Sequence, residues 1–262
     1  MTNSKAVGRP NGSEDAIGLL KRRFDGAVVL VVGGAGGIGS EVVRQAADLG
    51  ARVVVASRNG APLGAVGGAK MISARLDLTD PRSIAAFADW MRSEFPRLDV
   101  LVNTAGVTRQ VVLRDLDKLD DDTIDLVFAS NATGVLRLLR DLLSSLREAP
   151  DPCIVNVSSV AARTGVGSNV AYVGAKAALD AMSVALAKAL APEIRVVSVT
   201  PSALETDFVT GRSRDFIDRT IIATPLGRLA TTKEVANAVL CAAGILTMTT
   251  GSAIYVDGGR HL

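Results

Sequence analysis

Short apolar runs recur along the chain from about residue 27 onward, each separated from the next by a longer stretch of mixed polarity. Most of these runs are apolar at every position, which is the pattern of strands that are covered on both faces of a sheet. They predict strands at Ala27–Val32, Arg52–Ala56, Met71–Asp77, Asp99–Asn103, Cys153–Ser158, Arg195–Thr200 and Ala253–Val256.

The stretches between these runs are compatible with helices. The predicted helices lie near Ile38–Leu49, Pro81–Phe95, Asp122–Arg147, Tyr172–Leu190 and Lys233–Ala243. Repeated alternation of strand and helix predicts a single-domain α/β fold, in which a doubly wound, seven-stranded and mostly parallel sheet carries helices on both faces. Ligands bind such a sheet at the carboxyl ends of its strands, so motifs at those ends carry the most weight.

The chain has one predicted domain, at residues 25–262, preceded by a polar segment. Residues 1–24 contain Gly8, Pro10 and Gly12 and show no long periodicity, so we predict a flexible tail outside the core. No repeat, low-complexity tract or linker divides the remainder. Its longest part without a predicted strand, Pro201–Arg228, is a candidate lid.

Composition narrows the chemistry. The 262 residues include 25 glycines, two tyrosines and one histidine, so mechanisms that need several histidines are excluded. Lysine and arginine number 29 against 27 acidic residues, and their scattered placement gives nucleic-acid binding no support. Cys153 and Cys241 lie far apart in apolar stretches, which predicts core residues in a reducing compartment and no metal site. With no run of 18 apolar residues and no apolar leader, we expect no membrane contact and a cytoplasmic location.

A glycine-rich turn follows the first predicted strand. It contains Gly33, Gly36, Gly37, Ile38 and Gly39, and a helix begins within it. Glycines allow positive φ and bring backbone N–H groups close to a pyrophosphate, which the positive end of the helix also favours. The alternative is that the glycines only permit tight packing of helix on strand. The strand–turn–helix context favours phosphate binding.

Several ordered motifs between residues 25 and 262 resemble those of the short-chain dehydrogenase/reductase family. Gly33-x3-Gly37-x-Gly39 is similar to its T-G-x3-G-x-G turn, and Asn103-Thr104-Ala105-Gly106 to its N-N-A-G. Ser159 precedes Tyr172-x3-Lys176 by thirteen residues, and Val256-Asp257-Gly258-Gly259 is similar to its V-D-G-G ending. The resemblance is closest to 3-oxoacyl-thioester reductases. It implies a Rossmann-like fold, an NAD(P)-dependent oxidoreductase acting on carbonyl or alcohol groups, and a homotetramer, with a dimer as the alternative.

The serine, tyrosine and lysine of this pattern have a common chemical use. Tyr172 and Lys176 are one helical turn apart, so phenol and ammonium share a face. Lowering a phenol pKa from about 10 to about 7 needs roughly 4 kcal/mol, of which a helix N-terminus supplies at most about 2 kcal/mol. Lys176 and oxidised nicotinamide must supply the rest. We expect Tyr172 to be the general acid or base and Ser159 to hydrogen-bond the same substrate oxygen.

The resemblance assigns two further roles near this centre. It implies that Lys176 binds the nicotinamide ribose and that Asn131 anchors a water in a proton relay to Lys176. Each of these four residues could instead have a purely structural role. Ser159 could cap a loop, Tyr172 could be a core aromatic and Lys176 a solvated helix residue. Asn131 could be a polar group that interrupts a helix. Their joint order behind a phosphate-binding turn favours catalysis.

The cofactor prediction depends on the end of the second strand. An acidic residue there would bind the ribose of NAD and repel the 2′-phosphate of NADP, whereas this chain has Ser57 and Arg58. A guanidinium pairs well with phosphate, so NADP(H) is favoured and NAD(H) is the alternative. The remaining cofactor contacts that the resemblance implies are Asp77, Leu78, Asn103, Ala105, Gly106, Pro201, Ser202, Leu204 and Thr206.

The substrate is predicted to lie between Ser159, Tyr172 and the segment Asp207–Thr224, and to be a small-molecule or carrier-bound carbonyl compound. The alternating charges of that segment predict a solvated lid helix or, alternatively, a guide for an acidic carrier. The alternative functions are an NAD-dependent alcohol, sugar or steroid dehydrogenase and a nonenzymatic dinucleotide sensor. An extended epimerase or dehydratase is disfavoured, because the chain after Pro201 is too short for a substrate domain.

Overall fold

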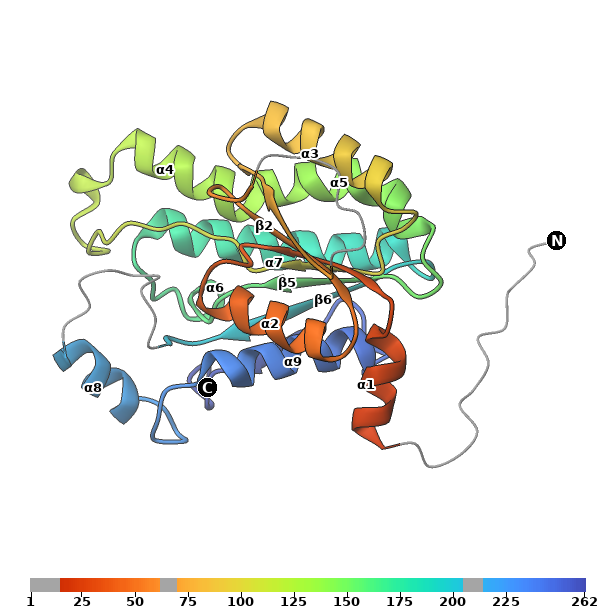
Figure 1. Cartoon of the computed structure of the whole chain (residues 1–262). Coiled ribbons are helices and arrows are strands. Elements are labelled where there is room, and N and C mark those ends of the chain that lie inside the picture. Colours follow the sequence, from red (N-terminus) through yellow and green to blue (C-terminus); the bar gives the residue numbers. More distant parts are fainter. Residues whose placement is uncertain (1–14, 62–69, 205–213) are drawn as a thin grey trace.

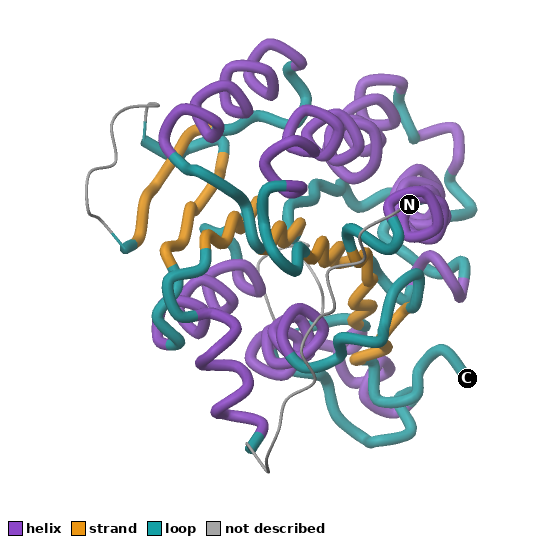
Figure 2. Tube along the Cα trace, turned by 90° about the vertical axis from the view of Figure 1, so that its right-hand side faces the viewer, coloured by secondary structure: helices purple, strands orange, loops and turns teal. Residues whose placement is uncertain are grey.

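Seven parallel strands form one sheet in the order β3-β2-β1-β4-β5-β6-β7 in the computed structural model, which describes residues 15–61, 70–204 and 214–262. Helices lie on both sides of the row of strands (Figure 2). The strands are β1 Val28–Val32, β2 Arg52–Ser57, β3 Met71–Arg75, β4 Val100–Asn103, β5 Cys153–Val157, β6 Arg195–Pro201 and β7 Ala253–Val256. All seven predicted strands are confirmed, and the sheet expected to be mostly parallel is parallel throughout.

Burial follows the position of each strand in the sheet. The central strands β1, β4 and β5 are buried at every residue, as their continuous apolar sequences predict. The edge strand β3 alternates between exposed and buried residues, and β7 at the other edge has no buried residue. The apolar core therefore centres on β4 and its two neighbours β1 and β5.

Two helical layers cover the sheet (Figure 1). One apolar cluster joins α3 (Pro81–Glu94), α5 (Gly134–Arg147) and α7 (Val170–Leu190) to one face, and a second joins α2 (Gly37–Asp48) and α9 (Thr232–Gly244) to the other. Within the described ranges, α7 alone is long and apolar enough to cross a membrane. Its buried apolar residues belong to the core clusters, so one face of this helix packs on the sheet and on the neighbouring helices.

The helix predicted at Asp122–Arg147 is interrupted. The structure has α4 at Asp121–Phe128, a π-helical turn at Ala129–Thr133 and then α5. Gly134 begins α5, and a Cβ there would lie 2.2 Å from the carbonyl oxygen of Leu78. The helix therefore passes against the loop after β3, and a π-turn of this kind is often found beside a functional site.

The segment predicted as a tail ends in a helix. Residues Ala16–Phe24 form α1, with Asp15 as its N-cap, and the Phe24 side chain is 0% exposed. Arg23 donates hydrogen bonds to the carbonyl oxygens of Asp99 (3.1 Å) and Asp151 (2.7 Å), which hold the helix at the amino ends of β4 and β5. The prediction of a tail over residues 1–24 is therefore wrong for its last nine residues, because the basic run masked a short amphipathic helix.

Three smaller elements complete the described chain. The short helix α6 (Ala161–Thr164) and a 3₁₀ turn at Leu116–Lys118 were not predicted. The helix α8 (Arg214–Ile222) lies within the segment predicted as a lid, at the carboxyl edge of the sheet (Figure 1). Ion pairs between Arg214 and Asp218 and between Arg219 and Asp215 join successive turns on its exposed surface.

We predict that Phe24→Ala lowers the free energy of unfolding by about 3 to 5 kcal/mol, because it removes a fully buried ring from between α1 and α9. Equilibrium unfolding in urea measures the change. Ile17→Ala, on the exposed side of the same helix, is the control and is expected to change it by about 0.5 kcal/mol or less. Equal effects of the two substitutions would show that α1 does not dock as described.

Candidate active site

A cavity of about 370 Å³ lies at the carboxyl edge of the sheet, where the ends of β1, β2, β4, β5 and β6 meet the N-termini of α2 and α7. It spans the point where the strand order reverses, between β1 and β4, which is the usual ligand position in a doubly wound sheet. The predicted residues that line it are Gly33, Gly36, Gly37, Ile38, Gly39, Ser57, Arg58, Asp77, Leu78, Ala105, Gly106, Ser159, Tyr172, Lys176, Pro201, Ser202 and Leu204.

The glycine-rich turn brings two backbones into close contact. Gly33 has φ +81°, and a Cβ on it would lie 2.6 Å from the backbone nitrogen of Ala105. A Cβ on Gly39 would lie 2.3 Å from the carbonyl oxygen of Gly33 and 2.7 Å from Oγ1 of Thr104. Any larger side chain at these positions would push α2 away from β1 and the loop after β4.

The N-terminus of α2 faces this cavity, and no side chain caps the backbone N–H groups of its first turn. Its N-cap is Gly36, which has no side chain to accept the N–H groups of the first turn. Gly37 and Ile38, in that first turn, line the cavity. Free N–H groups at the positive end of a helix favour an anion, so the turn fits the pyrophosphate of a dinucleotide.

The opposite end of the cavity is formed by the loops after β2 and β3. Ser57 ends β2, and the exposed Arg58 follows it directly. Asp77 also lines this end, and its Oδ1 accepts hydrogen bonds from the backbone N (2.9 Å) and Oγ1 (2.7 Å) of Thr79. Because that carboxylate oxygen is used within its own turn, Arg58 is the more available charged group here.

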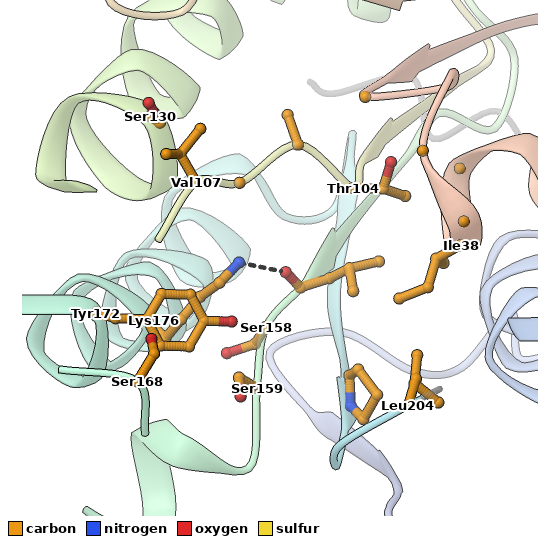
Figure 3. A pocket seen from close by; sticks show the side chains of 18 of the residues that line it. Ile38, Thr104, Val107, Ser130, Ser158, Ser159, Ser168, Tyr172, Lys176 and Leu204 are labelled. Atoms are coloured by element: carbon orange, nitrogen blue, oxygen red, sulfur yellow. Dashed lines mark hydrogen bonds between the residues drawn. The ribbon is translucent and has the colours of Figure 1, made fainter. Parts of the chain in front are cut away.

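Tyr172 is positioned by the start of α7. Asn169 is the N-cap of this helix, and its Oδ1 accepts a hydrogen bond of 2.7 Å from the backbone N of Tyr172. Asn169 also donates from Nδ2 to the carbonyl oxygen of Arg109 (2.7 Å), so the same amide fixes the helix start to the loop after β4. The Tyr172 ring is 8% exposed, and its hydroxyl points toward Ser158 and Ser159 (Figure 3).

Lys176 lies one turn further along α7 and is 4% exposed. Its Nζ donates a 2.9 Å hydrogen bond to the carbonyl oxygen of Val157, at the end of β5, and lies 5.9 Å from the centroid of the Tyr172 ring. Burial lowers the pKa of the ammonium to about 8, against the opposing charge of Asp180. The pKa of Asp180 is itself raised by burial, an effect that Ser158, Lys176 and Ser198 oppose. Lys176 therefore stays predominantly charged at neutral pH beside the phenol.

Ser159 follows β5 at the cavity wall. Its Oγ accepts a hydrogen bond of 3.2 Å from the backbone N of Ala161, which orients the side chain at the start of α6. The hydroxyl proton is then available for another acceptor, because a serine hydroxyl both accepts and donates. Ser159, Tyr172 and Lys176 are thus brought to one wall of the cavity, as the thirteen-residue and four-residue spacings predict (Figure 3).

Two predicted residues lie behind the wall and are not part of its lining. Asn103 donates from Nδ2 to Oδ1 of Asn156 (2.7 Å), so it joins β4 to β5 beneath the surface. Asn131, 0% exposed in the π-turn, donates from Nδ2 to the carbonyl oxygens of Val107 (2.8 Å) and Val127 (2.9 Å). Asn131 therefore holds the loop that carries Val107, a lining residue, in place. Thr206 and the segment 207–213 lie outside the described residues.

Other lining residues were missed by the sequence reasoning. They include Val107, Gln110, Ser130, Ser168 and Arg260, whereas Phe216 lies within Asp207–Thr224, the segment predicted to border the substrate. Most lie on loops without a local signal. For Arg260 a signal existed, because Gly258 and Gly259 immediately precede it and both have positive φ. In the described part of the chain, no three histidine, cysteine or acidic side chains are grouped so that they could hold a metal ion.

A doubly wound sheet of this order, with a cavity at its switch point and a glycine-rich turn on its wall, is typical of a dinucleotide-binding protein. Comparison with known proteins gives the family. The family model described as enoyl-(acyl carrier protein) reductase matches residues 33–261. The 3-oxoacyl-(acyl-carrier-protein) reductase FabG of Escherichia coli (strain K12) is 33% identical over 248 residues, 91% of this chain and 99% of that protein. The chain belongs to the short-chain dehydrogenase/reductase family.

Two further relatives show the breadth of this similarity. D-threitol dehydrogenase of Mycolicibacterium smegmatis (strain ATCC 700084 / mc(2)155) is 33% identical over 259 residues, 90% of this chain and 94% of that one. The crystal structure of 3-ketoacyl-(acyl-carrier-protein) reductase from Brucella melitensis complexed with NADH superposes with a TM-score of 0.81 and 28% identity, covering 91% and 100% of the two chains. The protein is therefore an oxidoreductase that acts on carbonyl or hydroxyl groups with a nicotinamide dinucleotide.

We predict that burial of Lys176 makes stability depend on pH above 8. Between about pH 8 and pH 10.5 the unfolded lysine keeps the proton that the folded one has lost, so the unfolded state binds more protons and stability rises with pH. Relative to Lys176→Met, the free energy of unfolding of the wild type is expected to rise by roughly 3 kcal/mol over this range. Urea unfolding of both proteins from pH 7 to 10.5 measures the difference.

Lys188→Met provides the matched control, since Lys188 is an exposed lysine on the same helix. A difference between wild type and Lys176→Met that stays constant with pH would contradict the assigned effect of burial.

Proposed function

We propose that the protein is an NADP(H)-dependent carbonyl reductase in which Tyr172 is the general acid or base, and that its substrate is a 3-oxoacyl thioester. The observation that carries the proposal is the placement of a phenol between a strand-end serine and a buried ammonium group at one cavity wall. A core aromatic needs neither neighbour. A nonenzymatic dinucleotide sensor, the alternative from another class, would have no use for this arrangement.

The residues act on the carbonyl oxygen in this proposal. Ser159 donates a hydrogen bond to that oxygen and fixes its direction, while Tyr172 transfers a proton to it as the alcohol forms. The positive charge of Lys176 stabilises the phenolate that remains. A bound nicotinamide supplies or accepts the hydride.

Asn131 positions the loop that carries Val107, and its side-chain oxygen has a second role in the proposal. Its Oδ1 is buried without a hydrogen-bond partner among the described residues, so it is an acceptor next to the site. This supports the proposed water-linked proton relay from Lys176. The reprotonation of Tyr172 between turnovers would then not require the cavity to open.

The preference for NADP(H) rests on the end of β2. The exposed Arg58 supplies a fork of N–H donors that matches a phosphate, and Ser57 adds a hydroxyl. No acidic residue stands at either position to repel a 2′-phosphate. NAD(H) is the second candidate, and the NADH complex of the Brucella melitensis relative favours it.

The similarity to 3-oxoacyl-(acyl-carrier-protein) reductases supports the thioester substrate. The similarity to D-threitol dehydrogenase supports a sugar or alcohol substrate as the second candidate. We also propose a homotetramer in the cytoplasm, with a dimer as the alternative. Its contact surfaces would be α4–α5 and α7, where Leu136 and Val184 are exposed. Light scattering of the purified protein tests the assembly.

We predict that Tyr172→Phe lowers kcat/KM for a 3-oxoacyl thioester by about 10²- to 10⁴-fold, because the substitution removes the hydroxyl that donates the proton and keeps the aromatic ring. Steady-state oxidation of NADPH measures the rate, and fluorescence titration is expected to show that NADPH still binds. Tyr255→Phe is the control, because Tyr255 lies on β7 and stacks on His261. Near-normal turnover by Tyr172→Phe would overturn the assignment of the acid.

We predict that Arg58→Glu weakens NADPH binding by about 10- to 100-fold and affects NADH binding much less. The substitution removes the guanidinium that pairs with the 2′-phosphate and adds a carboxylate that repels it. The Kd values of both dinucleotides measure the change. Arg82→Glu makes the same charge change at an exposed site outside the cavity and serves as the control. Equal loss for both dinucleotides in Arg58→Glu would favour NAD(H) or loose specificity.

A further inference from the structure

Arg260 lines the cavity and is hydrogen-bonded to α8, the helix that also contributes Phe216 to the lining. It is one of three cationic side chains in the described lining, with Arg58 and Lys176. Arg58 lies at the end of β2, and Lys176 is held by the carbonyl oxygen of Val157. Arg260 is therefore the lining cation that lies beside α8, in the part of the cavity bordered by the segment predicted to face the substrate.

The backbone fixes Arg260 in this place. Gly258 (φ +65°) and Gly259 (φ +89°) turn the chain sharply after β7. A Cβ on Gly258 would lie 2.6 Å from Cγ2 of Thr224, so the turn is in close contact with the residues after α8. Nη1 of Arg260 donates to the carbonyl oxygen of Thr220 in α8 (3.1 Å), and the guanidinium is thereby anchored beside the lid helix.

The carboxylates near Arg260 already have partners. Oδ1 of Asp257 accepts a hydrogen bond from the backbone N of Gly259 (2.9 Å), and Oδ2 accepts from the backbone N (2.9 Å) and Nδ1 (2.8 Å) of His261. The two aspartates of α8 pair with Arg214 and Arg219. Among residues 15–61, 70–204 and 214–262, Arg260 forms no ion pair, although it is only partly exposed.

We propose that Arg260 binds a negatively charged group, a carboxylate or a phosphate, on the carbonyl substrate, and so selects anionic substrates over neutral ones. The described lining offers no carboxylate at this end that would repel such a group, since its one acidic residue is Asp77. A guanidinium with one donor anchored keeps further N–H donors for an oxyanion. This specificity role rests on the proposed carbonyl reductase function.

The test compares three substrates that share one 3-oxobutanoyl group. Acetoacetate carries a carboxylate, acetoacetyl-coenzyme A carries phosphates, and ethyl acetoacetate is neutral. The kcat/KM of each with NADPH is measured for wild type, Arg260→Gln, Arg260→Lys and Arg214→Gln. Arg214→Gln removes one charge from α8 outside the cavity and is the control for general attraction of anions.

For Arg260→Gln we expect the ratio of kcat/KM for an anionic substrate to that for ethyl acetoacetate to fall about 10- to 100-fold, mainly through KM. A fall confined to acetoacetate identifies a carboxylate as the bound group, and one confined to the coenzyme A ester identifies a phosphate. Arg260→Lys is expected to recover part of the ratio, and Arg214→Gln to leave it unchanged. An unchanged ratio in Arg260→Gln, with or without an equal loss on all three substrates, would overturn the proposal.

A binding measurement separates this role from the proposed activity. The affinity of wild type and Arg260→Gln for acetoacetate and for acetoacetyl-coenzyme A is measured by calorimetry in the presence of NADP⁺. Weaker binding by the variant, together with no reduction of any substrate by the wild type, would keep the anion site and remove the proposed function. Equal binding by both proteins would remove the anion site whatever the activity.

Discussion

The site depends on one interaction, the hydrogen bond made by the buried ammonium group of Lys176. Its hydrogen bond to the carbonyl oxygen of Val157 joins α7 to the end of β5, so helix and strand cannot move separately at this point. Burying a cation is unfavourable, and the lowered pKa of Lys176 expresses that cost. The rest of the fold must therefore offset the unfavourable burial of this charge. The charge in turn lies one helical turn from the Tyr172 phenol, where it favours the phenolate.

The rest of the cavity depends on close backbone contact. At Gly33 and Gly39 a single methyl group would collide with the backbone of the loop after β4 or of the turn itself. Two wall types thus meet in one cavity: a wall of backbone N–H groups on the β1–α2 side and a wall of side chains on the β5–α7 side. The first suits a phosphate and the second a reacting group, and the order of the parallel strands brings these two walls, which are far apart in the sequence, to the same edge of the sheet.

The sequence predicts those features whose signal is local. Continuous apolar runs located the central strands, because a strand such as β5 is buried on both faces. The spacing of Tyr172 and Lys176 located the site because one helical turn fixes their relation. The prediction failed for α1, because this amphipathic helix is only nine residues long and its last turn carries the basic run Lys21-Arg22-Arg23. The side-chain partner of Asn103 could not be predicted, since no local pattern tells whether a strand-end side chain faces a cavity or the neighbouring strand.

The π-turn between α4 and α5 has a consequence for how this helix can change. Each residue advances an α-helix by about 100°, and a π-turn holds one more residue than a regular turn, so converting Ala129–Thr133 to regular α-helix without removing a residue would rotate one flanking helix against the other. Asn131 would then no longer reach the loop at Val107, and Gly134 would no longer face Leu78. The irregular turn at these five residues therefore keeps Asn131 against the loop and Gly134 against Leu78 at the same time, which a regular helix of the same sequence could not do.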